Sequence, residues 1–180
     1  MAEHSIVIAG FGGQGLLFAG KVLAYAGLME GREVSWLPSY GPEMRGGTAN
    51  CSVILSDDPV GSPIVDHPTV LMVMNGPSLE KFEPAVAPGG IVFVDDSLVP
   101  QAVERTDVTV IRIPATGMAA EKKAAGLANM ILLGALVEKT GCVTWEGLED
   151  GLRKVVPARK ADMIGLNLEA LAAGRACVKA

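Results

Sequence analysis

The chain has 180 residues and a net charge of −5 at pH 7, with acidic and basic residues spread along its length. Of these residues 49% are apolar and 4% aromatic, which predicts a single globular domain, residues 1–180, filled with aliphatic side chains. Because the basic residues do not cluster, the composition excludes nucleic acid or an anionic membrane as the main partner.

Three further classes of protein are disfavoured by simple counts. No apolar run approaches the roughly 18 residues that a membrane-spanning helix needs, and the N-terminus lacks a basic signal-peptide start, so we expect a cytoplasmic protein. Cys51, Cys142 and Cys177 are too far apart in sequence to suggest a disulfide framework or a metal cluster, and we expect buried thiols. His4 and His67 alone offer little for a Ser-His-Asp triad.

A glycine-rich turn follows the first expected strand, residues 5–11, and leads into a helix expected over residues 14–30. The residues of this turn are Gly10, Gly12, Gly13, Gln14 and Gly15. Glycine permits positive φ and leaves the backbone amides uncovered. A helix that begins near Gln14 points its unpaired N–H groups at the turn, which favours a phosphate or a carboxylate ligand.

The second expected strand is short, residues 33–37, and ends at Pro38 before a polar loop. The loop reads Ser39-Tyr40-Gly41-Pro42-Glu43-Met44-Arg45-Gly46-Gly47. Glu43 and Arg45 could project to one side of it, and Arg45 could bind a carboxylate or a phosphate bidentately. The alternative is a surface loop with an internal ion pair.

Two kinds of pattern predict the remaining strands. Alternating polar and apolar residues predict a strand over residues 48–55 with one face less deeply buried. Runs that are apolar at every position, residues 70–74 and 91–94, predict strands covered on both faces, as in a parallel sheet between helix layers. A short helix over residues 77–86 is expected between them, and a further strand over residues 108–113 after them.

From Thr116 onward the patterns predict helices alone. Their expected ranges are residues 118–125, 127–139, 144–155 and 160–178, with Thr144 as an N-cap. The expected fold class is therefore α/β, a three-layer Rossmann-like sandwich with a mostly parallel sheet and a helical C-terminal third.

Two patterns have competing functional interpretations. The glycine turn fits the dinucleotide pattern G-x-G-x-x-G, but such a site also needs an acidic residue where the second strand ends, and this sequence has Ser39 there. Asp95 and Asp96 follow a buried strand, where α/β proteins place ligand sites, yet a turn with a helix cap is the favoured interpretation. Asn75 occupies the equivalent place after the preceding strand.

Three segments together resemble the gamma subunit of the 2-oxoacid:ferredoxin oxidoreductases, also found as domain III of pyruvate:ferredoxin oxidoreductase. They are the turn over residues 8–15, the loop over residues 39–47 and Ala128-Asn129-Met130 inside an expected helix. The loop is most similar to the 2-oxoglutarate and branched-chain type. The residues that the resemblance assigns to ligand or subunit docking are Gly10, Gly12, Gly13, Gln14, Gly15, Tyr40, Glu43, Arg45, Gly46, Gly47 and Asn129.

The resemblance implies a complex that oxidatively decarboxylates a 2-oxoacid with coenzyme A and passes electrons through iron–sulfur clusters to ferredoxin. The sequence lacks the thiamine diphosphate signature and the repeated C-x-x-C pattern, so we expect no catalytic residue and no bound cofactor on this chain. Thiamine diphosphate, the iron–sulfur clusters and coenzyme A would belong to the full complex.

The implied partners are the thiamine-binding alpha and beta subunits, with a ferredoxin-like delta subunit as a further candidate. The isolated chain would be inactive and could form a homo-oligomer through its subunit-facing surface. The alternatives left open by the sequence are a freestanding Rossmann-type nucleotide-binding protein, an indolepyruvate oxidoreductase beta-type subunit, and an interaction module without a ligand.

Overall fold

The computed structural model describes residues 3–40 and 48–179, in which six strands form one sheet of order β2-β3-β1-β4-β5-β6. The strands are β1 (His4–Phe11), β2 (Glu33–Tyr40), β3 (Thr48–Ser56), β4 (Val70–Val73), β5 (Ile91–Asp95) and β6 (Thr109–Ile113). The strands β1, β4, β5 and β6 pair in parallel, whereas β3 is antiparallel to both β1 and β2. The predicted α/β fold with a mostly parallel sheet is confirmed.

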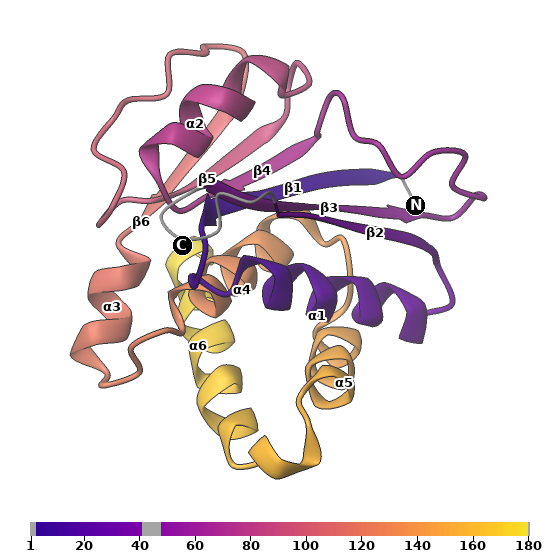
Figure 1. The fold of residues 1–180 in the computed structure, drawn as a ribbon, viewed down its shortest axis with the longest axis vertical. Coiled ribbons are helices and arrows are strands. Elements are labelled where there is room, and N and C mark those ends of the chain that lie inside the picture. Colours follow the sequence, from indigo (N-terminus) through magenta and orange to yellow (C-terminus); the bar gives the residue numbers. More distant parts are fainter. Residues whose placement is uncertain (1–2, 41–47, 180) are drawn as a thin grey trace.

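Helices cover the two faces of this sheet unequally. They are α1 (Leu16–Met29), α2 (Gly76–Phe82), α3 (Ala115–Glu121), α4 (Ala128–Thr140), α5 (Trp145–Val155) and α6 (Met163–Val178), with short 3-10 turns at Glu83–Ala85 and Ala158–Lys160. On one face α1 and α4 lie against the sheet, with α5 packed on α1 and α6 packed on α4, while α2 covers part of the other face (Figure 1). The C-terminal third is helical, as predicted.

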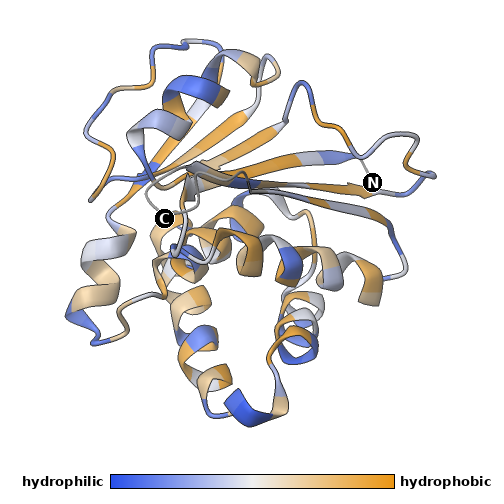
Figure 2. Cartoon of the chain, in the orientation of Figure 1, coloured by the Kyte–Doolittle hydropathy of each residue, from blue (hydrophilic) through white to orange (hydrophobic). Residues whose placement is uncertain are grey.

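Strand β1 has both faces in the core. Ile6 and Ile8 belong to the cluster beneath α1 and α4, and Val7 and Ala9 belong to the cluster beneath α2. All four are at most 2% exposed, and the strands of this region are strongly hydrophobic along their length (Figure 2). Both sides of β1 therefore hold it in place, which fixes the position of the turn that follows it.

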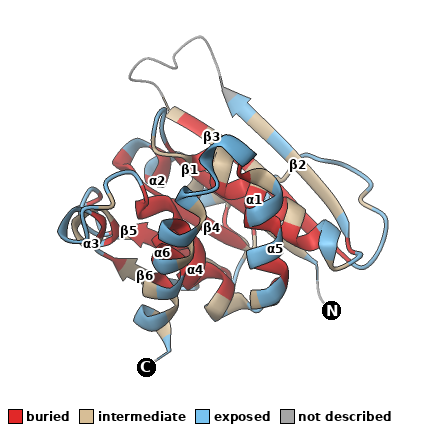
Figure 3. Cartoon of the chain, turned by 90° about the horizontal axis from the view of Figure 1, so that it is seen from below, coloured by how far each residue is buried: buried red, intermediate tan, exposed pale blue. Residues whose placement is uncertain are grey.

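Strand β2 is longer than the sequence predicted. It continues through Pro38 to Tyr40, and Pro38 pairs with Cys51 of β3. Because β2 is an edge strand, one of its sides has no neighbouring strand, and a proline is tolerated there although it cannot donate a backbone hydrogen bond. Figure 3 shows β2 at the rim of the molecule with mostly exposed or half-buried residues.

Two helix starts and the exposure of one cysteine differ from the sequence predictions, whereas a predicted helix cap is confirmed. Helix α1 begins at Leu16 and not at residue 14, because Gly15 adopts a left-handed conformation as the N-cap. Helix α3 begins at Ala115, three residues before the expected residue 118. Thr144 caps α5 as predicted, since its hydroxyl accepts a hydrogen bond from Gly147 N at 3.0 Å. Cys51 and Cys142 are buried as expected, but Cys177 is exposed near the end of α6.

Candidate functional site

The glycine turn is shaped by the side chain of Gln14. Gln14 Oε1 accepts a hydrogen bond from Phe11 N at 2.6 Å, and Gln14 Nε2 donates to Met74 O at 3.1 Å. A Cβ atom on Gly10 would collide with Gln14 Oε1, so Gly10 serves to make room for this side chain. The turn is thereby tied to the carboxyl end of β4.

The start of α1 is held from the opposite side by Asn129. This residue lies in the first turn of α4, is 3% exposed, and donates from Nδ2 to Gly15 O at 2.9 Å. Gly15 has φ of 74° and a Cβ atom there would lie 2.5 Å from Asn129 Nδ2, so both backbone conformation and space require glycine. The structure thus brings Asn129 next to Gln14 and Gly15, although Asn129 lies 114 residues after Gly15 in the sequence.

This end of the sheet offers polar backbone groups without side-chain partners. The N-terminus of α1 has no side-chain cap, and neither has that of α4. Asn129 Oδ1 is buried and has no hydrogen-bond partner among the residues that the structure describes. Unpaired N–H groups at a helix start favour an anion or a carbonyl group of a partner.

A shallow depression of about 250 Å³ lies beside the turn. Gly13 and Gln14 form one wall, and small residues of α3 and of the segment that follows it form most of the rest. Thr116 and the exposed Leu98 complete it. Its surface is therefore mainly apolar and is built largely from small side chains next to the glycine backbone.

Asp95, at the end of β5, is engaged within the protein. It is fully buried, and its carboxylate accepts hydrogen bonds from Ser97 N at 3.2 Å and from Thr116 Oγ1 at 2.5 Å. Asp96 is exposed and pairs with Arg112 at 2.6 Å. These contacts agree with the interpretation of this segment as a turn that anchors the start of α3.

The polar loop after β2 was the second predicted part of the site. Tyr40 is the last residue of β2. Glu43, Arg45, Gly46 and Gly47 lie outside the residues that the structure describes, so their assignment to docking stays a prediction. Gly12 lies within the turn and is exposed.

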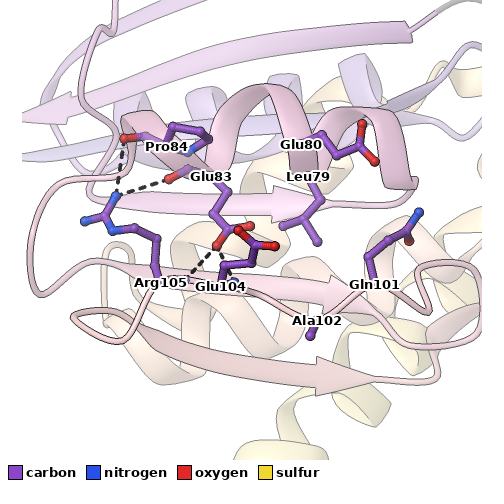
Figure 4. Close-up of a pocket in the computed structure, with 8 residues that line it drawn as sticks. All are labelled: Leu79, Glu80, Glu83, Pro84, Gln101, Ala102, Glu104 and Arg105. Carbon is purple, nitrogen blue, oxygen red and sulfur yellow. Dashed lines mark hydrogen bonds between the residues drawn. The ribbon is translucent and has the colours of Figure 1, made fainter.

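A larger hollow of about 400 Å³, which the sequence did not indicate, lies between α2 and the segment before β6 (Figure 4). Glu83 Oε1 accepts hydrogen bonds from Glu104 N at 2.6 Å and Arg105 N at 2.8 Å, and Arg105 donates to Glu83 O and Pro84 O. These bonds fasten the segment to α2.

The pKa of Arg105 is raised and that of Asp107 is lowered because their side chains hydrogen-bond each other.

The topology separates this site from a dinucleotide site. In a dinucleotide-binding sheet the second strand lies next to the first, so that its terminal acid reaches the ribose. Here β3 lies between β1 and β2 and runs antiparallel to both. The carboxyl end of β2 is consequently not the neighbour of the glycine turn.

No group of three His, Cys, Asp or Glu side chains in residues 3–40 and 48–179 could hold a metal ion. Within the same ranges, no helix is both long and apolar enough to cross a lipid bilayer.

These features define a class: a Rossmann-like α/β domain with a braced glycine turn at the point where the chain switches from one side of β1 to the other. The chain belongs to the pyruvate ferredoxin/flavodoxin oxidoreductase family, whose model matches residues 5–177. The family resemblance seen in the sequence is thus confirmed.

Two relatives illustrate how this domain occurs in other proteins. The chain is 41% identical over 176 residues to the ketoisovalerate oxidoreductase subunit VorA of Methanothermobacter thermautotrophicus, covering 96% of this chain and 36% of that protein. It therefore spans little more than a third of that relative. It is 36% identical over 180 residues to the 2-oxoglutarate synthase subunit KorC of Methanothermobacter marburgensis, covering 96% of this chain and 95% of that protein.

Two solved structures share the fold. One is the gamma subunit of a keto/oxoacid ferredoxin oxidoreductase from Geobacter sulfurreducens, with a TM-score of 0.83, 28% identity, and coverage of 97% of this chain and 98% of that chain. The other is the 2-oxoglutarate:ferredoxin oxidoreductase of Magnetococcus marinus with 2-oxoglutarate, coenzyme A and succinyl-CoA bound. It has a TM-score of 0.88 and 27% identity over 99% of this chain and 31% of that chain.

Proposed function

We propose that this chain is the gamma-type subunit of a 2-oxoacid:ferredoxin oxidoreductase. The complex would oxidatively decarboxylate 2-oxoglutarate or a branched-chain 2-oxoacid with coenzyme A, in the cytoplasm. The observation that carries the proposal is the match to a separate 2-oxoglutarate synthase subunit over 95% of that subunit's length. The whole chain, residues 1–180, would form one domain of this complex.

The chemistry would take place on partner subunits. Those partners would be thiamine-binding alpha and beta subunits, with a ferredoxin-like delta subunit as a further candidate. The cysteines of this chain do not fit an iron–sulfur cluster, because a cluster takes four thiolates and the sequence has three cysteines, of which Cys51 and Cys142 are buried and Cys177 is exposed. Burial also raises the pKa of Cys51 and of Cys142, which disfavours the thiolate that metal binding requires.

The glycine turn would be the part of this chain that borders the active site. Its support is structural: the turn is rigidly held by Gln14 and Asn129, and unpaired backbone N–H groups begin α1 beside it. Such a surface suits a phosphate of coenzyme A or a carbonyl group of a partner subunit. Arg45, which lies outside the described residues, would add a charged contact to the same active site.

Reconstitution tests this function. The tagged chain is expressed together with its candidate alpha and beta subunits, and coenzyme A-dependent oxidation of 2-oxoglutarate and of ketoisovalerate is measured with ferredoxin as acceptor. We expect the isolated chain to be inactive, and the other subunits to gain activity when it is added. Catalytic oxidation by the isolated chain, or full activity of the other subunits without it, would overturn the proposal.

A variant of the turn separates its two candidate contacts. Gln14→Ala removes both hydrogen bonds that shape the turn. If the turn meets coenzyme A, the KM for coenzyme A rises several-fold while the complex stays assembled. If it meets a partner subunit, the complex dissociates more readily. Unchanged assembly and unchanged kinetics would show that the turn borders neither.

A further inference from the structure

One half of the sheet is covered by helices on a single face. On the covered face, Cβ atoms on Gly20 and Gly27 of α1 would meet Trp36, Cys51, Val34 and Leu55 of β2 and β3. Side chains alternate along a strand, so the intervening residues point to the opposite face. The opposite face also carries Glu33, Ser35, Ile54 and Ser56, at the end of the two strands where Ile54 and Ser56 are buried. We call the remaining part, toward the carboxyl end of β2, the open sheet face; it consists of Leu37, Ser39, Thr48, Asn50 and Ser52.

The register of the two strands makes these residues one continuous surface. Leu37 pairs with Ser52, and Ser39 pairs with Asn50. All five are exposed or half-buried, and Leu37 is 40% exposed. Helix α2 lies over the β4 to β6 side of the sheet and does not extend across these two strands (Figure 1).

The chemistry of the open sheet face suits protein contact better than solvent. None of these five residues is charged, and the one charged residue of β2 and β3 on this side, Glu33, lies at the other end of β2, where it pairs with Ser56. Serine, threonine and asparagine are short and lose less on desolvation than charged groups, so a flat partner can approach closely. Interface centres are depleted in charge and contain a few apolar anchors, and Leu37 is such an anchor.

The edge of β2 is a less suitable docking surface than its face. An edge strand can extend a sheet by pairing with another chain through its backbone. Pro38 lies within β2 and cannot donate a backbone hydrogen bond, which weakens such pairing. The face of the two strands therefore remains as the available contact.

The way the domain occurs in its relatives indicates which protein would bind the open sheet face. It makes up 36% of the VorA chain, but nearly the whole of the separate KorC subunit. A domain that occurs both fused and separate needs a contact with the remaining part that holds without a covalent link. We propose that the open sheet face, centred on Leu37, docks on the subunit that corresponds to the rest of the VorA chain. This inference rests on the proposed function.

Charge placed on this face tests the proposal. The tagged chain is co-expressed with the other subunits of the complex and its affinity for them is measured after purification. We expect Leu37→Lys and Ser52→Lys each to weaken assembly at least about tenfold, because each buries an unpaired charge at an interface. The matched control is Val110→Lys on the opposite edge strand β6, where Val110 is 37% exposed, and we expect it to assemble normally.

Each outcome bears on a different claim. If the wild-type chain assembles and both face variants assemble equally well, the docking face is wrong while the proposed function stands. If the wild-type chain does not assemble at all, the proposed function fails and the docking face fails with it. If Leu37→Lys only converts a homodimer of the isolated chain into monomers, the face belongs to a second copy and the proposal is overturned. Melting temperatures of the isolated variants verify that each remains folded.

Discussion

The two halves of the sheet are built differently. In the parallel half, β4 and β5 are apolar and almost fully buried on both faces, because α4 covers one face and α2 the other. In the antiparallel half, residues of β2 and β3 that pack on α1 alternate with residues on the opposite side of the sheet, which include the open sheet face. One half of the sheet is thus core on both faces, whereas the other half has one accessible face, and the alternation of residue types distinguishes the two halves.

The largest expected contrast is between Phe93 and Ser52. Phe93 of β5 is fully buried, so Phe93→Ala should lower the free energy of unfolding by about 3–5 kcal/mol. Ser52→Ala on the open sheet face should change it by no more than about 0.5 kcal/mol. Urea denaturation of the isolated variants measures both. Equal losses at the two positions would show that both halves of the sheet contribute equally to stability.

Arg32 should contribute much to holding β3 against the segment that follows α4, because it bonds to Leu55 of β3 and to Cys142. Its guanidinium is buried, donates to Cys142 O at 2.6 Å and Leu55 O at 3.2 Å, and pairs with Asp57 at 3.3 Å. Arg32→Met removes the hydrogen bonds from the buried guanidinium to Cys142 O and Leu55 O and should cost about 3 kcal/mol. Asp57→Asn alters only the exposed partner and should cost less than about 1 kcal/mol. A cost for Asp57→Asn that matches Arg32→Met would place the stabilisation in the ion pair and not in the carbonyl contacts.

The close approach of α1 to the antiparallel half depends on Gly20. A Cβ atom on Gly20 would collide with Cys51 Sγ, so Gly20→Ala should destabilise the protein by about 1–3 kcal/mol. Cys51→Ala removes that sulfur. The double variant should therefore be more stable than the sum of the single losses, by about 1 kcal/mol, in a double-mutant cycle of thermal or urea unfolding. Strict additivity would mean that this contact does not limit the approach of the helix.

The smallest expected effect is the pH dependence of the Cys51 thiol. Burial raises the pKa of Cys51 to about 12 from an ordinary value of 9.0. The neutral thiol is thus favoured in the folded state, and its contribution is complete below pH 9 and is lost as the pH rises toward 12. At pH 10 this loss should be about 1.4 kcal/mol. It is measured as the shrinking difference in unfolding free energy between wild type and Cys51→Ala from pH 7 to pH 10, and a constant difference would contradict it.

Sequence patterns were sufficient where a local pattern decides the outcome. The uninterrupted apolar runs at residues 70–74 and 91–94 predicted β4 and β5 to within a residue, and the alternation at residues 48–55 predicted β3. They failed where the outcome depends on neighbours distant in sequence. The continuation of β2 through Pro38 depends on its position at the sheet edge, which no local pattern reveals.

The site shows the same division. The glycine turn was evident from the sequence, but its bracing was not, because Gln14 bonds to Met74, 60 residues away, and Asn129 bonds to Gly15, 114 residues away. Asn129 was singled out only through the family resemblance. The open sheet face was visible as alternation over residues 48–55, yet only the unequal helix coverage shows that this face is accessible.

The glycine turn takes its native shape only after distant parts of the chain have folded, because its hydrogen-bond partners lie far away in sequence. Gln14 lacks its partner Met74 until the chain has reached the end of β4, and Gly15 lacks its partner Asn129 until the chain has reached α4. During synthesis the N-terminal part emerges first, but its turn cannot take its final shape before residue 129 has packed against it. A partner that recognises the folded turn would therefore bind only chains that have been synthesised and folded beyond α4.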